Sequence, residues 1–208
     1  MSKHLTLYGA KTGNSIRAAI GLEEAGLPYT IERVALSRGE HKREPYLSMN
    51  PLGQVPALAV ADIDGQVAVI TQSNAIILYA AENANGNDLL GKTPEVRAKT
   101  FERFFYFVTD VIVPSNIGFR LKGTAFADAA QHLDATVVSS ISYANAFLGS
   151  HPFMAGDAFS IADIAAVTIV SAYADVIDWP KLPDLGDWFK RVSERDGVRH
   201  GFAAFSPG

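Results

Sequence analysis

The sequence changes character after residue 83, and this change limits the folds open to the chain. Before it, strand patterns at 4–8, 28–36 and 56–70 alternate with helical patterns at 15–25 and 71–83. The last strand pattern consists of two apolar runs around Asp64-Gly65, a dipeptide typical of a tight hairpin. The chain therefore begins with a small α/β domain whose elements run β-α-β and then β-β-α.

Beyond this domain the strand patterns disappear. The stretch NANGNDLLGKTP is rich in Asn and Gly and predicts a linker, and the helical patterns that follow lie at about 95–121, 124–149, 160–176 and 183–195. Pro114 is expected to kink or break the first of them, and Ser160 to Asp163 form a capping box at the start of the third. We predict an α/β domain at 1–83, a linker at 84–94 and an all-helical domain at 95–208.

Composition excludes several classes of function. The formal charge is −4 and the basic residues are scattered, so we expect no nucleic-acid partner. No apolar run is long enough for a signal peptide or a membrane span, so we expect no membrane partner and a cytoplasmic location. The chain has no cysteine, and its five histidines lack metal-ligand spacing, so no metal is expected. Any sulfur chemistry would need a sulfur that arrives with a ligand.

The first candidate cluster is TGNSIR, Thr12 to Arg17, where the first helix begins. Thr12, Asn14 and Ser15 are ordinary helix-capping residue types, which is one interpretation. The other is that the helix N-terminus stabilises an anion, with a hydroxyl and an amide donating to a bound thiolate. One such hydrogen bond, worth about 1.5–3 kcal/mol, would lower the pKa of a thiol by roughly 1–2.

Two further clusters also allow a structural and a functional interpretation. Val55-Pro56 either shapes a connection into a strand or, if the peptide bond is cis, turns the Val55 N–H and C=O outward to pair with a peptide-like ligand. At the next helix start, Ser73 or Asn74 either caps the helix, or Ser73 binds a carboxylate while Gln72 recognises a neighbouring amine.

The three clusters in this order resemble those of the cytosolic glutathione transferase superfamily, over nearly the whole chain. The match rests on IGLEEAGLPY, GEHKREPYLSMNPLGQVPAL, TQSNAIILYAAEN, FSIADIA and LPDLGDWFKRVSERDGV. The resemblance implies a thioredoxin-like domain followed by an all-helical domain. It also implies glutathione as cosubstrate, a small apolar electrophile held by the helical domain, a homodimer and a role in detoxification.

The resemblance also implies roles for single residues. The loop after the second strand is similar to that of the phi class, in which a His-Lys pair binds the glycine end of glutathione. Elsewhere the matched positions bind the cysteinyl backbone and the γ-glutamyl group, and a carboxylate from the partner subunit helps to hold the amine. The binding candidates in this sequence are His41, Lys42, Gln54, Val55, Pro56, Gln72, Ser73 and Asp110. For His41 and Lys42 the alternative is a solvated loop, and for Asp110 an ordinary surface carboxylate.

At the position of the thiol-activating residue, the sequence resembles more than one class of the superfamily. Phi and tau enzymes have Ser where Thr12 stands, whereas nu-type enzymes have Thr-Pro-Asn-Gly, of which Thr12 and Asn14 match and Gly13 and Ser15 depart. In the mu and pi classes a Tyr at the end of the first strand activates the thiol, and Tyr8 lies near that position. We rank Asn14 and Thr12 first and Tyr8 next. The absence of cysteine excludes the beta, omega and zeta patterns.

Several activities remain open alongside transferase chemistry. The chain is also compatible with nu-like disulfide reduction using two glutathiones, with a glutathione-dependent lyase acting on an ether or halide bond, and with a non-catalytic glutathione-binding protein. In the helical domain, aromatic residues either pack between helices or line a pocket for the electrophile. These residues are Phe105, Tyr106, Phe119 and Phe126.

Overall fold

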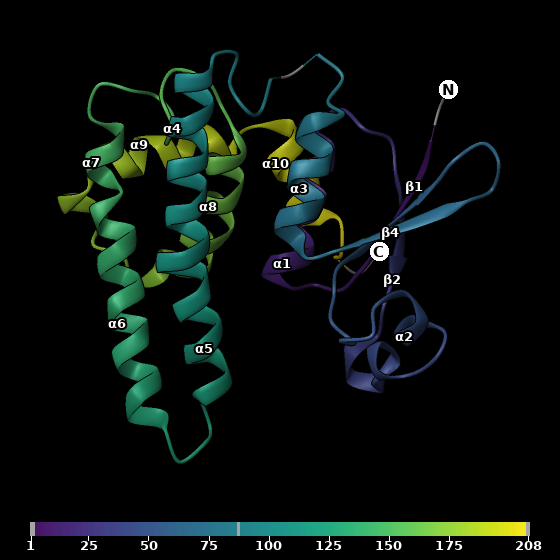
Figure 1. Ribbon diagram of the computed structural model, residues 1–208. Coiled ribbons are helices and arrows are strands. Elements are labelled where there is room, and N and C mark those ends of the chain that lie inside the picture. The colour runs from purple at the N-terminus through teal and green to yellow at the C-terminus, as the bar shows by residue number, and fades with distance from the viewer. Residues whose placement is uncertain (1–2, 87, 207–208) are drawn as a thin grey trace. The chain divides into compact units, whose positions relative to one another are not determined.

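The computed structural model describes residues 3–86 and 88–206 (Figure 1). The chain forms two compact units, one comprising Asp88–Glu194 and the other comprising the segments before and after it. The first of these segments contains a four-stranded sheet with helices, and Asp88–Glu194 is helical. The predicted fold class, a thioredoxin-like domain followed by a helical domain, is therefore confirmed.

The sheet of the α/β unit has the strand order β2-β1-β3-β4. Its strands are β1 (His4–Gly9), β2 (Thr30–Arg33), β3 (Ala57–Ala61) and β4 (Val67–Thr71). β1 runs parallel to β2 and antiparallel to β3, and β3 runs antiparallel to β4. The strand predicted at 28–36 is shorter than expected because β2 is an edge strand and only its four residues pair with β1.

Two helices of this unit, α1 (Gly13–Glu24) and α3 (Ser73–Glu82), pack against each other. Gly21 permits the close approach, since a Cβ added there would lie 3.1 Å from Ile77 Cγ1. The long loop after β2 contains two 3-10 turns, η1 (Leu36–Arg38) and η2 (Glu40–Lys42), and the short helix α2 (Tyr46–Met49). A four-residue helix is too short to leave a periodic sequence pattern.

The last helix, α10 (Asp196–Ala203), belongs to the α/β unit, whereas the sequence assigned it to the helical domain. α10 packs on α1, and a Cβ added at Gly201 would lie 2.7 Å from the backbone nitrogen of Ile20. Before it, the Arg195 guanidinium binds the buried Glu24 carboxylate through two bonds, Nε to Oε1 at 2.9 Å and Nη2 to Oε2 at 2.6 Å. Such long-range contacts do not change the periodicity of a helical sequence, so the pattern could not show to which unit α10 belongs.

The helical unit contains α4, a π-helical segment, α5 to α9 and two 3-10 turns. Their bounds are α4 Pro94–Phe105, the π segment Tyr106–Ile112, α5 Val113–Leu121, α6 Ala127–Tyr143, α7 Asn145–Leu148, α8 Ile161–Ala172, η4 Ala174–Val176, η5 Trp179–Lys181 and α9 Pro183–Ser193. No helix within the described residues has the length and apolar character needed to cross a membrane.

The break considered at Pro114 does not occur, because α4, the π segment and α5 follow one another without interruption. The chain instead widens into the π segment just before Pro114, where the Val113 N–H donates to the Val108 carbonyl. Proline lacks the N–H that a regular α-turn would need, and a widened turn accommodates that loss within a continuous helix.

The capping box predicted at 160–163 is confirmed at the start of α8. The Asp163 carboxylate accepts hydrogen bonds from the Ser160 N–H at 2.9 Å and the Ser160 hydroxyl at 3.1 Å. It also accepts from the Met154 N–H at 2.9 Å and from Trp188 Nε1 at 2.8 Å. One fully buried carboxylate therefore joins the helix start, the preceding loop and α9.

Candidate functional site

The register of the sheet brings the three predicted clusters together at one edge of the sheet, where the ends of its central strands lie side by side. Tyr8 in β1 pairs with Ala57 in β3, which in turn pairs with Thr71 in β4. The end of β1, the start of β3 and the end of β4 therefore lie in one row across the sheet. The loops that carry the clusters leave or enter the strands at this row, so segments distant in sequence become neighbours.

At the start of α1, Thr12 is the N-cap, so the capping interpretation is confirmed. Its Oγ1 accepts from the Ser15 N–H at 3.2 Å and donates to Ser15 Oγ at 3.0 Å. Ser15 Oγ also accepts from the Ala10 N–H at 3.3 Å. The N–H groups of Gly13 and Asn14 have no acceptor within the helix. Because the first turn carries no acidic residue, these donors and the positive end of the helix dipole favour an anion.

Arg17 connects the start of α1 to the start of α3, and sequence reasoning missed it. Its Nη1 donates to Asn14 Oδ1 at 2.9 Å and to Ser73 Oγ at 3.3 Å. Arg17 is only 3% exposed, and burial lowers its pKa to about 10, so it remains protonated at neutral pH. Its position three residues after Asn14 is the one signal in the sequence that pointed to the first contact.

The start of α3 has unusual backbone geometry. Gln72 is its N-cap residue, with φ 74° and ψ 117°, and it is the one non-glycine residue of the described chain with positive φ. No side chain caps this helix, so the interpretation of Ser73 or Asn74 as caps is wrong. Such a backbone conformation costs a non-glycine residue about 1–3 kcal/mol, and residues strained in this way cluster at functional sites.

The loop into β3 leaves peptide groups available at the same edge. The Val55–Pro56 peptide bond is cis, the geometry considered from the sequence. The neighbouring Gln54 carbonyl accepts from the Tyr46 hydroxyl at 2.6 Å and from Asn50 Nδ2 at 2.7 Å. The Val55 N–H and C=O have no hydrogen-bond partner among the described residues, as a segment that pairs with an extended ligand requires.

His41 and Lys42 lie on η2, against the loop that leads to Gln54. Lys42 Nζ donates to the Leu52 carbonyl at 3.1 Å. His41 Nδ1 is buried and has no hydrogen-bond partner among the described residues. The structure therefore brings the His-Lys pair next to the segment that precedes Val55.

Tyr8 lies on the other face of the sheet from α1. Leu7 and Gly9 face α1, since a Cβ added at Gly9 would lie 3.0 Å from Ser15 Oγ, and side chains alternate along a strand. Tyr8 instead packs against Val34 and Tyr46, and it lines a pocket of about 390 Å³ on that face. Thr12 and Asn14 thus share the start of α1, and Tyr8 is separate from them.

The remaining candidates lie in the helical unit. Asp110 is exposed in the π segment, and its Oδ2 accepts from Thr109 Oγ1 at 2.6 Å. Of the four aromatic candidates, Phe119 lines a pocket of about 540 Å³. The Tyr106 hydroxyl donates to the Ser140 carbonyl at 2.7 Å. Phe105, Phe119 and Phe126 are all exposed.

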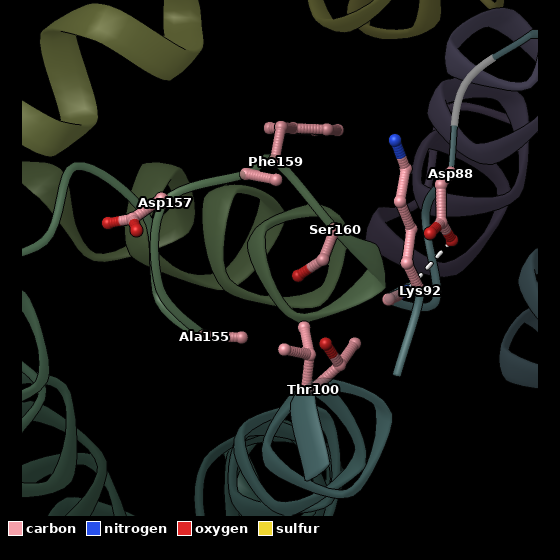
Figure 2. Close-up of a pocket in the computed structure, with 10 residues that line it drawn as sticks. Asp88, Lys92, Thr100, Ala155, Asp157, Phe159 and Ser160 are labelled. Atoms are coloured by element: carbon pink, nitrogen blue, oxygen red, sulfur yellow. Dashed lines mark hydrogen bonds between the residues drawn. The ribbon is translucent and has the colours of Figure 1, made fainter. Parts of the chain in front are cut away.

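A second cavity of this unit, of about 310 Å³, lies between α4 and the loop before α8 (Figure 2). Thr100 comes from α4, and Phe159 and Ser160 come from the loop. Ser160 already serves the capping box, and the Asp88 carboxylate accepts from the Gly91 N–H at 2.8 Å. Polar groups of this cavity therefore support the local fold. Among the described residues, no group of three or more His, Cys, Asp or Glu side chains is arranged to hold a metal ion.

Comparison with known proteins identifies the family of the chain. The family model for the N-terminal domain of glutathione S-transferases matches residues 14–83, and the model for their C-terminal domain matches 115–196. Glutathione S-transferase F9 of Arabidopsis thaliana is 30% identical over 97% of this chain and 98% of its own length. The disulfide-bond oxidoreductase YfcG of Escherichia coli K12 is also 30% identical, over 92% of this chain and 91% of its own.

Solved structures give the same result at the level of the fold. A glutathione transferase homologue from Sulfitobacter with bound glutathione aligns with a TM-score of 0.78 at 26% identity, covering 94% of this chain and 95% of its own. A family member from Pseudomonas fluorescens with two glutathiones bound has a TM-score of 0.83 at 21% identity, covering 95% of this chain and 92% of its own. The chain belongs to the cytosolic glutathione transferase superfamily.

Proposed function

We propose that the protein is a glutathione transferase that ionises the glutathione thiol at the start of α1 for attack on an apolar electrophile. The observation that carries this proposal is the contact made by Arg17, which joins the N-termini of α1 and α3. Two helix starts without acidic residues in their first turns suit a ligand with two separated negative groups. A thiolate and the γ-glutamyl carboxylate of glutathione meet that requirement.

In this proposal glutathione lies along the edge of the sheet in an extended form. The Ser73 N–H and hydroxyl bind the γ-glutamyl carboxylate, and Gln72 recognises the amine, with help from the partner subunit's Asp110. The cysteinyl backbone pairs with the N–H and C=O of Val55, between Gln54 and Pro56. His41 and Lys42 bind the glycine carboxylate, for which the unpartnered Nδ1 of His41 is available.

Thr12 and Asn14 are the proposed donors to the sulfur, and Tyr8 ranks behind them because it packs on the opposite face of the sheet. The Thr12 hydroxyl donates to Ser15 Oγ. Hydroxyl hydrogens rotate, so Ser15 can donate to Thr12 instead and free the Thr12 hydrogen for sulfur. The nucleophile belongs to the cosubstrate, so catalysis consists of thiolate stabilisation and positioning.

The test is a pH titration of bound glutathione followed by thiolate absorbance. We expect the wild-type protein to lower the pKa of the thiol, and Asn14→Ala or Thr12→Ala to raise it again by about 1 or more, since one charged hydrogen bond has that value. Thr30→Ala is the matched control, because Thr30 lies at the start of β2 and bonds to Leu5 and Thr6. An ordinary thiol pKa in the wild-type complex contradicts the proposal. If both variants keep the lowered pKa, the role moves to Tyr8, tested by Tyr8→Phe.

A second prediction concerns the replacement of Gln72 by glycine, which should raise the stability of the protein and lower its affinity for glutathione. Glycine tolerates positive φ, so Gln72→Gly should raise the free energy of unfolding by about 1 kcal/mol. Because the amide is lost, the affinity for glutathione should fall. Urea unfolding and calorimetric titration measure the two effects, with Gln66→Gly in the β3–β4 turn as control. Tighter glutathione binding by the variant would contradict the role given to Gln72.

A second candidate function is disulfide reduction with two glutathiones. It is favoured by the 30% identity to YfcG and by the Thr12 and Asn14 positions. In that reaction two glutathione thiols become glutathione disulfide while a small disulfide is reduced to two thiols. Activity on a small disulfide with none on an aryl halide would select this function.

We also include in the proposal a homodimer, a cytoplasmic location and a detoxifying role, as the family suggests. The helical unit carries exposed apolar side chains along α4 and α5 that a second subunit would cover. These side chains are Val96, Phe105, Val113 and Ile117.

A further inference from the structure

The segment after α10 reaches the turn between β1 and α1. Phe205 follows the last helix and is 5% exposed. A Cβ added at Gly9 would lie 2.6 Å from its Cζ, 2.8 Å from its Cε1 and 3.0 Å from Ser15 Oγ. The aromatic ring, the Gly9 backbone and the Ser15 hydroxyl therefore fill one small space that has no room for a methyl group.

Ser15 connects this contact to the proposed sulfur site. Its Oγ holds the Ala10 N–H at 3.3 Å and the Thr12 hydroxyl at 3.0 Å. Both groups belong to the turn that places Thr12 at the start of α1. Gly9, Ser15 and Phe205 are all buried, so the Phe205 ring packs against the interior of that turn.

The tail is also fastened to the strand next to Gly9. Arg33, at the end of β2, is the register partner of Gly9, and the Val34 N–H donates to the Gly9 carbonyl at 2.8 Å. Arg33 Nη2 donates to the Ser206 carbonyl at 3.0 Å and approaches the Ala204 carbonyl at 3.5 Å. The backbone on both sides of Phe205 is thus bound to the end of the same strand pair.

We infer that Phe205 is a positioning residue for the thiol site. It fixes the β1–α1 turn so that the Thr12 hydroxyl and the N–H groups of Gly13 and Asn14 are aimed at the sulfur. This inference rests on the proposed function, since it assigns a part of the thiolate site to the C-terminal segment. Loss of the ring leaves a cavity into which the turn relaxes, and a small change in donor direction weakens a hydrogen bond to a thiolate steeply.

The test compares thiol ionisation with binding that needs no thiolate. Phe205→Ala should lower the thiolate fraction of bound glutathione at neutral pH by about tenfold, a rise of one in the thiol pKa. The Kd of S-methylglutathione, which has no ionisable thiol, should stay within about threefold of the wild-type value, since that change is under 0.7 kcal/mol. Phe205→Leu should restore most of the lowered pKa, and Phe202→Ala, on α10, is the matched control.

The outcomes separate this inference from the proposed function. A wild-type complex with an ordinary thiol pKa overturns the proposed function and this inference with it. A lowered pKa that Phe205→Ala leaves unchanged overturns the inference alone, as does an equal loss of S-methylglutathione affinity, which would mean general damage to the site. If Phe205→Ala does not fold, Arg33→Gln loosens the tail without altering the ring, and an unchanged thiol pKa in that variant overturns the inference.

Discussion

Replacement of Asp163 by alanine is expected to lower the free energy of unfolding by about 4 kcal/mol or more, since four hydrogen bonds are lost at roughly 1–3 kcal/mol for each donor left unsatisfied. The carboxylate accepts from Met154, from two groups of Ser160 and from Trp188, and it is fully buried. Burial raises the pKa of Asp163, and the same four donors act against that rise.

Urea unfolding of the Ala and Asn variants measures this effect. Asp163→Asn retains one acceptor oxygen but turns an N–H₂ group toward buried donors, so it should be nearly as unstable as the alanine variant. Asp157→Ala is the matched control, because Asp157 is exposed, lies before the same helix and pairs with His151 at 3.0 Å. The control should stay within about 0.5 kcal/mol of the wild type. A similarly small loss for Asp163→Ala would show that the preceding loop and α9 are held by other contacts.

The sequence predicted the fold class because its strongest signals are local. Alternation in β1, the Asp-Gly hairpin between β3 and β4 and the capping box at Ser160 each reflect contacts between residues close in the chain. The change from strand to helical patterns after residue 83 separated the α/β part from the helical part in the same way. Propensity and periodicity are sufficient for such features.

Features that depend on long-range contacts were not predicted. α10 returns to α1 through Gly201 and through the Glu24–Arg195 pair, and these residues are ordinary in their local patterns. Tertiary packing decides where α10 belongs.

The candidate site was predicted in part. Most of its residues lie in loops and at helix starts beside one end of the strands, and the sequence located these segments through their helix-start and proline signals. The sequence did not reveal that Gln72 has positive φ or that Tyr8 lies on the other face from α1. Above all it did not reveal Arg17, since an arginine one turn into an amphipathic helix is normally solvent-exposed.

The second prediction with a large expected effect is the replacement of Arg17. Its guanidinium holds the Asn14 amide and the Ser73 hydroxyl together, so its removal should disturb the proposed sulfur site and the proposed carboxylate site at once. We expect Arg17→Met to weaken glutathione binding by at least about tenfold, which corresponds to 1.4 kcal/mol, and to raise the thiol pKa. Methionine fills the buried volume of the stem, and its thioether places no charge in the site.

Arg17→Lys separates charge from geometry. A lysine ammonium keeps the positive charge but lacks the planar guanidinium fork, which fixes the direction in which Nη1 donates to Asn14 and Ser73. If the charge is decisive, the lysine variant should bind glutathione nearly as tightly as the wild type; if the fork is decisive, it should behave like Arg17→Met. We expect the latter, because the two helix starts are joined through hydrogen bonds of fixed direction. Wild-type affinity and thiol pKa in Arg17→Met would show that α1 and α3 hold their positions without this contact, and the observation that carries the proposed function would then have no bearing on glutathione.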